Sequence, residues 1–382
     1  MVTLTAGPTA HALASSARDM DIGYERLWHE RPSLTLLRRG AALARQLPLE
    51  RQVVWSRRTR NAGLWNECPL MATAQDPTIG LPDRATAAGA AWSIARDRRA
   101  RAILRCLVPG LDGAALTDLG AVMSPTDLAD LDKGPFIWSV TPFFNELDML
   151  EARLSEMAHA VDRFVVVEAR QTHRGEPKPL YFEQAKARFT AWSTQLDYCV
   201  VDLPANADNW GRERFQRDVA RSVLTDLGAS ADDLVLLTDL DEIVSAERVP
   251  AVLDATASGP AVLQMTQHWY NLGWREPGQW MHPKAFRFGQ VPASITYSEV
   301  RHMAFFPVTE AGWHLSWFGR SDQFDYKLRS FAHAEYDTED RHVPGFQKTL
   351  QANGTDIHGR RLLRSPIYFP SSTKALFSLE EQ

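Results

Sequence analysis

The sequence predicts an α/β protein in which helices flank a mostly parallel β-sheet, preceded by a helical N-terminal extension. Three observations support this fold class. From about residue 136 onward, short apolar runs typical of buried strands alternate with amphipathic helical segments. Polar or acidic residues follow several of these runs, as expected at the carboxyl ends of parallel strands. The first 134 residues lack this alternation and are rich in Ala, Leu and Arg.

The first strand, helix and strand of the sheet are expected between residues 137 and 168. Ile137 to Val140 predict a strand, and Asn145 is a suitable N-cap because its side-chain oxygen accepts an unpaired N–H. Apolar residues then recur at helical spacing, namely Leu147, Leu150, Leu154, Met157, Ala158 and Val161. Phe164 to Val167 form the second strand, which ends at Glu168. A right-handed crossover makes these two strands parallel.

A second unit of the same kind follows. Tyr198 to Val201 predict a strand, and Trp210 to Leu227 predict a helix with one apolar face and Gly228 just past its end. The run Leu234 to Leu237 then predicts a fourth buried element, a short strand. It leads directly into Asp239-Leu240-Asp241-Glu242.

Asp239 and Asp241 are the strongest candidates for chemistry. They follow a buried strand, and the carboxyl edge of an open α/β sheet is where ligands bind. Two carboxylates one residue apart on a turn can reach one hard divalent cation, which keeps other positions open for phosphate oxygens. His314 is a candidate third ligand, because imidazole suits Mn²⁺. The simpler interpretations are a solvated acidic turn and a hydrogen-bonded structural histidine.

Other candidate donor-binding residues are charged. Glu168 ends a strand, where a carboxylate can accept an N–H from a nucleobase, although a capping or ion-paired carboxylate explains it equally well. Arg217 precedes the acidic motif, and guanidinium groups pair well with diphosphate. Lys327 and Arg301 are weaker cases of the same argument. A solvated helix face is the alternative for the arginines.

Composition excludes several classes of function. The 382 residues carry a formal net charge of -5 without a basic cluster, which argues against binding of nucleic acid. Three widely spaced cysteines without a Cys-x-x-Cys motif favour a reducing, cytoplasmic location. No apolar stretch approaches the length of a membrane-spanning helix, and no secretory signal is evident. There is also no glycine-rich dinucleotide motif and no phosphate-binding P-loop.

The chain is expected to contain two units. Residues 1–134 form a helical extension, with helices expected at 33–46 and 85–107, and residues 135–382 form the main domain. The extension carries no recognisable chemical site. Packing on the main domain, oligomerisation and binding of an acceptor all remain open for it, and the oligomeric state is not predicted.

The acidic motif is also compatible with two other functions. A strand followed by Asp also begins haloacid-dehalogenase-type phosphatases, with Asp239 as the nucleophile, but those enzymes have a later acidic pair, often Gly-Asp. This chain has no Gly-Asp dipeptide. The second rival is a non-catalytic module that binds a nucleotide sugar or a carbohydrate without transferring it.

The motifs between residues 137 and 337 resemble, in order, those of glycosyltransferase family 17. The matching stretches are Phe144 to Asp148, Val165 to Ala169, Gly175 to Leu180, Asp233 to Ile243, Gly312 to Trp317, and Lys327-Leu328 followed by Ser330. The resemblance implies a glycosyltransferase A-type, Rossmann-like fold and an inverting transfer from a UDP-sugar, with UDP-GlcNAc the expected donor. By that analogy Asp239 and Asp241 hold Mn²⁺ (or Mg²⁺) against the diphosphate, while Asn145 and Glu168 lie near the nucleotide. The chain departs from animal members in lacking a membrane anchor, which favours a glycan or lipid-linked saccharide as acceptor.

An inverting transfer needs a base opposite the diphosphate. Asp322 is the first choice, because it lies in the loop expected just after the Gly312 to Trp317 segment. Glu276 and Glu299 are the alternatives. Aromatic rings stack on the apolar faces of sugars, so the proposed acceptor platform is Trp269, Tyr270 and Trp274.

Overall fold

The protein is represented by a computed structural model whose chain divides into two compact units, residues 1–132 and 133–382. The structure describes residues 44–45, 48–61, 68–130, 134–319, 321–330 and 333–365. The helix expected at 33–46 lies almost entirely outside these ranges. Among the residues described, no helix combines the length and the apolar character that crossing a membrane requires.

The first unit is helical where it is described. Its helices are α3 (Leu49–Asn61), α4 (Pro69–Gln75), α5 (Leu81–Ala95), α6 (Arg98–Leu107), α7 (Gly113–Val122) and α8 (Pro125–Asp130). The single helix expected at 85–107 is instead two helices. Arg96 adopts a left-handed conformation with φ 53°, and the Asp97 side chain caps α6 by accepting from the backbone N–H groups of Arg99 and Ala100. The cap therefore starts a new helix instead of extending α5.

Helices α5 and α7 approach each other closely at Gly89. A Cβ atom at this position would overlap the side chains of Leu119 and Met123, both of which are buried. The glycine therefore permits the tight packing that forms the core of this unit.

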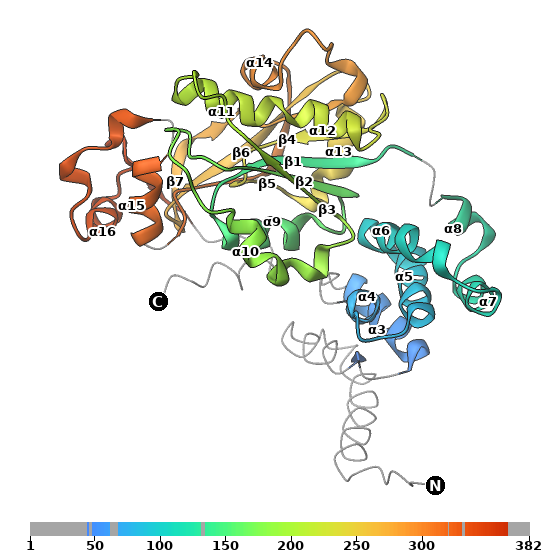
Figure 1. The fold of residues 1–382 in the computed structure, drawn as a ribbon. Coiled ribbons are helices and arrows are strands. Elements are labelled where there is room, and N and C mark those ends of the chain that lie inside the picture. The colour runs from blue at the N-terminus through green and yellow to red at the C-terminus, as the bar shows by residue number, and fades with distance from the viewer. Residues whose placement is uncertain are drawn as a thin grey trace, which may run out of the picture. The chain divides into compact units, whose positions relative to one another are not determined.

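The second unit is built on a central sheet of four parallel strands (Figure 1). They are β1 (Ile137–Phe143), β2 (Arg163–Ala169), β3 (Leu196–Val201) and β4 (Leu234–Leu237), in the spatial order β3-β2-β1-β4. Each covers a run predicted from the sequence, so the α/β class with parallel central strands is confirmed. The helix expected at 210–227 is divided at Val219 into α11 (Asn209–Asp218) and α12 (Ala220–Asp226).

The C-terminal half extends this sheet mainly by antiparallel pairing. Strand β8 (Lys284–Arg287) pairs with β4 and with β6 (Ala261–Trp269), which in turn pairs with β7 (Asn271–Trp280). Strand β9 (Phe306–Ser316) runs parallel to β6 and antiparallel to the short β5 (Glu242–Val244). Strand β10 (Leu363–Arg364) closes the edge at β7. The full sheet is therefore mixed.

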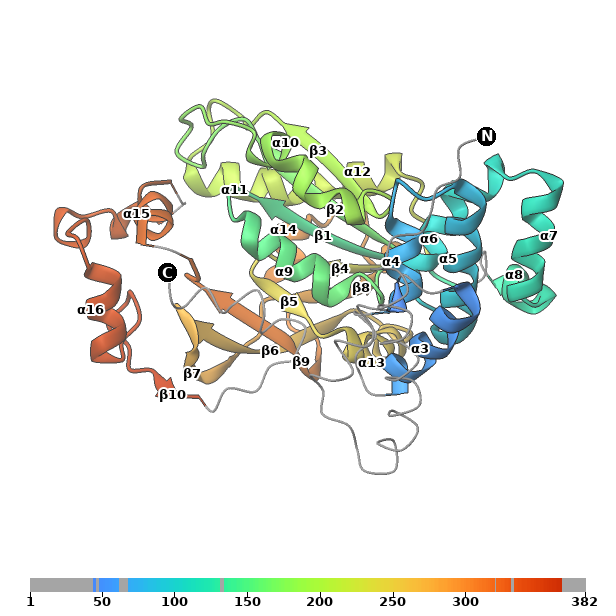
Figure 2. The same ribbon diagram turned by 90° about the horizontal axis from the view of Figure 1, so that it is seen from below.

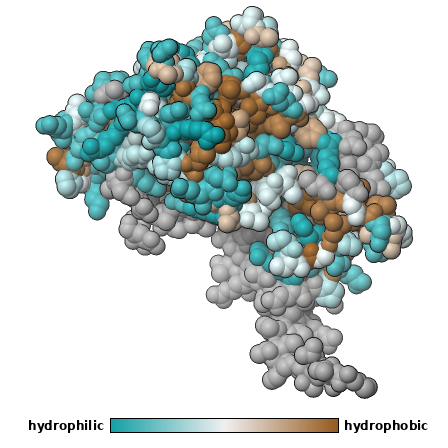
Figure 3. Space-filling model, viewed as in Figure 1, coloured by the Kyte–Doolittle hydropathy of each residue, from teal (hydrophilic) through white to brown (hydrophobic). Residues whose placement is uncertain are grey.

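Helices cover both faces of the sheet. Helices α9 (Leu147–Met157) and α10 (Tyr181–Ala185) lie on one face, and α11, α12 and α14 (Tyr297–His302) lie on the other (Figures 1 and 2). Helix α13 (Val249–Ala255) lies near β9, and α15 (Ser321–Ser330) and α16 (Phe346–Asn353) form a C-terminal segment whose surface is mainly hydrophilic (Figure 3).

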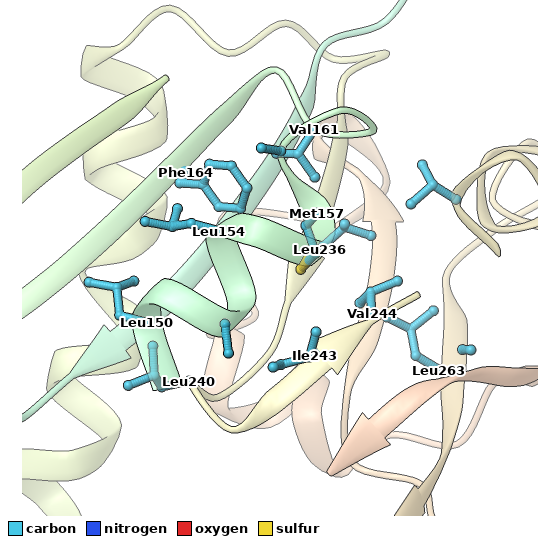
Figure 4. Packing of buried hydrophobic residues seen from close by; sticks show 14 of the residues in the cluster. Leu150, Leu154, Met157, Val161, Phe164, Leu236, Leu240, Ile243, Val244 and Leu263 are labelled. Carbon is cyan, nitrogen blue, oxygen red and sulfur yellow. The ribbon is translucent and has the colours of Figure 1, made fainter. Parts of the chain in front are cut away.

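The main core lies between α9 and the sheet (Figure 4). Leu150, Leu154 and Met157 of α9 are completely buried, as their helical spacing predicts, and they belong to one apolar cluster with Phe164 and Leu236. Burial of each such side chain contributes about 1.5–3 kcal/mol. This packing fixes α9 beside the carboxyl end of β4.

Strands β9 and β5 approach each other closely at Gly312. Replacing this glycine by alanine should therefore destabilise the protein much more than the same change at Gly259. Gly312 and Gly259 have similar φ angles, 154° and 152°, but a Cβ at Gly312 would overlap the Ile243 carbonyl oxygen, whereas a Cβ at Gly259 meets nothing within 4 Å. We expect Gly312→Ala to lower the free energy of unfolding by more than about 4 kcal/mol. Gly259→Ala should cost only the backbone strain, about 1–3 kcal/mol. Urea denaturation followed by circular dichroism measures both, and equal losses would contradict this account.

Candidate functional site

The acidic motif forms the turn that joins β4 to β5. Strand β4 ends at Leu237, which pairs with Val140 of β1, and β5 begins at Glu242. The turn therefore lies at the carboxyl edge of the parallel strands, where the sequence predicts it. Asp239 and Asp241 are partly exposed there, with 30% and 20% of their side-chain surfaces accessible.

Arg153 of α9 holds the main chain of this turn. Its guanidinium is completely buried and donates to the carbonyl oxygens of Asp239 (3.0 Å) and Glu242 (2.9 Å), and to the hydroxyl groups of Ser139 (2.9 Å) and Thr238. Burial lowers the pKa of Arg153 to about 10, and the neighbouring carboxylates oppose that shift, so the side chain remains cationic at neutral pH. Arg153 thus helps to fix the backbone conformation of the turn.

Glu242 is the second buried charged residue that holds the turn. Its carboxylate accepts the Asp239 backbone N–H (2.6 Å), the Trp280 indole N–H (2.5 Å) and both terminal nitrogens of Arg301 (2.9 and 2.5 Å). A fully buried carboxylate is tolerated only when it is paired and hydrogen-bonded in this way. Glu242 therefore links the acidic turn to β7 and α14.

Asp239 is held by two arginines. Its Oδ1 lies 3.1 Å from Arg217 Nη2 and its Oδ2 lies 2.6 Å from Arg301 Nη2, and both arginine side chains are buried. Burial alone would raise the pKa of Asp239, but Arg301 and Arg217 lower it well below its ordinary value. Asp239 is consequently an anion at any pH near neutral, and both of its oxygens are engaged by the protein.

Asp241 is engaged much more loosely. Its nearest cationic or imidazole partners are His314 Nε2 at 3.6 Å and Lys327 Nζ at 3.7 Å, and Lys327 also lies 3.4 Å from Glu146. Burial would raise the pKa of Asp241, whereas His314 and Lys327 lower it. The other ring nitrogen of His314, Nδ1, is buried and has no hydrogen-bond partner in the described part of the chain. Asp241 is thus the carboxylate of the pair that remains available to a ligand.

A cavity of 530 Å³ opens above these residues, a size suited to a small-molecule ligand. Its walls come from the ends of β1 and β6, from α11, from β9 and from the C-terminal segment. Of the residues predicted from the sequence, it is lined by Arg217, Asp239, Asp241, Trp269, Arg301, His314 and Lys327. Five further histidines line it, namely His173, His282, His302, His333 and His358.

Glu168 does not reach this cavity. Its carboxylate is completely buried and accepts from Lys178 Nζ, the Tyr198 hydroxyl, and the backbone N–H groups of Tyr181 and Phe182. All of these donors belong to the protein, so Glu168 anchors the start of α10 and lies outside the cavity lining. Asn145 also lies outside the cavity lining.

The candidate bases are placed differently. Glu299 caps α14 by accepting the Thr296 backbone N–H (2.7 Å) and is exposed. Glu276 accepts from the Trp269 indole (3.2 Å) and pairs with Arg360 (2.6 Å). Neither residue lines the cavity. Asp322 lies in the first turn of α15, but its side chain is outside the described part of the structure.

The proposed acceptor platform is only partly at the cavity. Trp269 lines it, although the side chain is 2% exposed. Tyr270 is buried in the same apolar cluster as Trp269, does not line the cavity, and donates to the Thr355 carbonyl oxygen (3.2 Å). The Arg364 guanidinium lies 3.8 Å above the ring of Trp274, which also lies outside the cavity lining.

Three site residues were not assigned roles from the sequence. Arg153 is one of two charged residues, with Glu156, on the mainly apolar buried face of α9, and a charge at such a position is a usable signal for a buried arginine with a specific role. Glu242 lies inside the acidic motif itself. Trp280 lines the cavity with its ring centroid 4.2 Å from that of His314, and nothing local in the sequence distinguishes it from other tryptophans.

Comparison with known proteins identifies the family to which this site belongs. The model of glycosyltransferase family 17 matches residues 133–359, which is more than half of the chain and includes the whole cavity lining except Arg360. The chain belongs to glycosyltransferase family 17. The family match extends through the acidic turn and the C-terminal segment, so both belong to the family domain.

Three curated relatives are named beta-1,4-mannosyl-glycoprotein 4-beta-N-acetylglucosaminyltransferase. The rat protein is 25% identical over 251 residues, which cover 55% of this chain and 46% of the relative. The human protein is 30% identical over 146 residues, covering 35% and 27% respectively, and the mouse protein is 24% identical over 251 residues, covering 55% and 46%. The chain thus matches less than half the length of each relative.

The role of Arg153 predicts a large stability effect. Replacement by Met leaves the carbonyl oxygens of Asp239 and Glu242 and the Ser139 hydroxyl without their buried donor, so we expect Arg153→Met to lower the free energy of unfolding by about 3–5 kcal/mol. Arg170 provides a matched control because its ion pair with Asp202 is largely exposed, and its replacement by Met should cost about 0–1 kcal/mol. Urea denaturation measures both, and similar small losses would show that Arg153 does not hold the turn.

Proposed function

We propose that this family-17 protein transfers a sugar from a nucleotide-sugar donor to an acceptor hydroxyl, with UDP-GlcNAc as donor and a glycan or lipid-linked saccharide as acceptor. One observation carries the proposal. An acidic turn at the carboxyl edge of parallel strands opens into a cavity that also contains Arg217, Arg301 and Lys327. Cationic side chains of this kind bind a diphosphate and stabilise the charge that develops as it leaves. The choice of GlcNAc as the transferred sugar follows the names of the curated relatives.

The fold supports the same proposal. Parallel strands β3-β2-β1-β4, helices on both faces and an acidic pair at the strand ends are the features expected of the glycosyltransferase A-type fold. The phosphatase alternative loses support, because a nucleophilic Asp239 needs a free carboxylate oxygen and both of its oxygens are engaged by arginines.

The residues present fit a divalent cation in part. Two ligand atoms at right angles on one octahedral cation lie about 3 Å apart, and Asp241 Oδ1 and His314 Nε2 are 3.6 Å apart. Asp239 fits less well than predicted because its oxygens are engaged. No cluster of three His, Cys, Asp or Glu side chains suited to a metal occurs within the described residues. Asp241 and His314 are therefore the proposed protein ligands for Mn²⁺ or Mg²⁺, which when bound would offset charge on the leaving diphosphate.

The proposed reaction is a single inverting displacement. The acceptor oxygen forms a bond to the anomeric carbon while the bond from that carbon to the diphosphate oxygen breaks, and UDP leaves. A carboxylate takes the proton of the attacking hydroxyl. Asp322 remains the proposed base, because Glu276 and Glu299 have structural partners and lie outside the cavity lining. Arg217, Arg301 and Lys327 bind and orient the diphosphate.

The cation assignment predicts that Asp241 and His314 act together. We expect Asp241→Asn and His314→Ala each to weaken Mn²⁺ binding and to lower sugar transfer or UDP-sugar hydrolysis about 100-fold, equivalent to ~2.7 kcal/mol. Asp325→Asn is the control, because Asp325 is on α15 but pairs with Arg329 and His342 instead of lining the cavity. Electron paramagnetic resonance titration of Mn²⁺ and a UDP-release assay measure the two effects. Full Mn²⁺ binding and turnover in both variants would show that Asp241 and His314 do not bind the cation.

The base assignment predicts a loss of turnover without a loss of donor binding. Asp322→Asn should lower kcat about 10²–10⁴-fold, because proton removal is lost, and should leave the donor dissociation constant unchanged. Glu276→Gln and Glu299→Gln serve as comparison variants and should retain the catalytic step. Steady-state kinetics measures kcat, and calorimetric titration with the donor measures its dissociation constant, so the two effects are separated. A fully active Asp322→Asn enzyme would show that another residue is the base.

A further inference from the structure

One face of α11 lines the cavity along its length. Trp210, Glu213, Arg214 and Arg217 all contribute to the cavity wall, and their spacing of three, four and seven residues places them on one side of the helix. At 1.5 Å per residue, Trp210 and Arg217 are separated by about 10 Å along the helix axis. An extended nucleoside diphosphate separates its base from its phosphates by a comparable length.

The position of α11 is fixed at the strand ends. Gln216, on the sheet side of the helix, donates to the carbonyl oxygens of Phe143 (3.2 Å) and Val167 (2.8 Å), the residues near the ends of β1 and β2. The helix is also capped by Asp208, which accepts the Gly211 N–H. The cavity-facing side chains of α11 are therefore held in a defined register above the parallel strands.

Arg217 provides an anion-binding group at the inner end of this face. Its Nη2 binds Glu213 (2.5 Å) and Asp239 (3.1 Å), yet its Nε is buried and has no hydrogen-bond partner within the described chain. The side chain is 5% exposed and lines the cavity. An unpaired buried donor on a cavity wall beside a second cation, Arg301, is the arrangement that a phosphate oxygen completes.

Trp210 provides an aromatic group at the outer end. Its side chain is 39% exposed although it lines the cavity, and its ring meets that of His333 at 87° with the centroids 4.5 Å apart. An indole held at the mouth of a cavity offers a flat surface on which a nucleobase stacks. Glu168, the sequence-based candidate for the nucleobase, is closed off by protein donors.

We propose that α11 binds the donor at two points: Trp210 stacks on the base of a nucleoside diphosphate while Arg217 binds its phosphates. This inference rests on the proposed function, because it assumes a nucleotide-sugar donor. Stacking is tolerant of base identity, so Trp210 supplies affinity for the nucleoside, and Arg217 supplies affinity for the diphosphate group alone.

The test compares two probes, UDP and inorganic diphosphate, by calorimetric titration of the full chain in the presence of Mn²⁺. Trp210→Ala should weaken UDP binding about 10-fold or more and leave inorganic diphosphate binding unchanged, and Trp210→Phe should restore most of the UDP affinity. Arg217→Gln should weaken both probes about 10-fold or more. Phe215→Ala is the matched control, because Phe215 is equally exposed on α11 (39%) but does not line the cavity, and it should leave both affinities unchanged.

The outcomes separate the inference from the function it rests on. If the wild-type chain binds UDP and Trp210→Ala binds it equally tightly, α11 does not recognise the nucleoside and the inference is overturned while the proposed transfer stands. If Trp210→Ala weakens UDP and inorganic diphosphate equally, the effect is structural and the inference is also overturned. If the wild-type chain does not bind UDP, the proposed function fails and the inference with it. Circular dichroism of each variant identifies any that has not folded.

Discussion

The site depends on charge that is buried beneath the turn between β4 and β5. Arg153 and Glu242 are both completely inaccessible to solvent, and both bind the main chain of the turn, Arg153 through the carbonyl oxygens of Asp239 and Glu242 and Glu242 through the Asp239 N–H. Removing two such charges from water is costly, and hydrogen-bonded and oppositely charged partners offset that cost. Here the partners are the turn itself, Ser139, Arg301 and Trp280, so the network and the shape of the turn require each other.

A division of roles between the two aspartates follows from this network. Asp239 is part of the scaffold, because Arg217 and Arg301 take both of its oxygens, whereas Asp241 meets its neighbours only at 3.6 and 3.7 Å. The protein therefore holds one of these two neighbouring carboxylates tightly and the other loosely. One organises cations that face the cavity, and the other is available to an incoming positive charge.

The sequence was most informative where periodicity and burial coincide. The spacing of Leu150, Leu154 and Met157 predicts the buried face of α9, and the apolar run before Asp239 predicts β4, because each pattern reflects a single surface packed on the core. The role of Glu168 was not predictable, since a carboxylate at a strand end can face either a ligand or the next loop. That choice depends on residues 10 to 30 positions away, Lys178 and Tyr198 among them. The antiparallel half of the sheet and the buried Arg153 also depend on distant partners, which local patterns do not report.

Lys327 gives the C-terminal segment a direct connection to the site. It extends from α15 to lie between Glu146, at the start of α9, and Asp241, and its ammonium group lies 5.4 Å from the ring centroid of Trp317. A ligand that binds the Lys327 ammonium group, or that replaces it beside Asp241, changes the free energy with which α15 packs against the rest of the site. Thermodynamic linkage makes the relation reciprocal, so whatever displaces α15 alters ligand affinity by the same factor. The segment beyond β9 is in this sense an energetic component of the pocket as well as part of its wall.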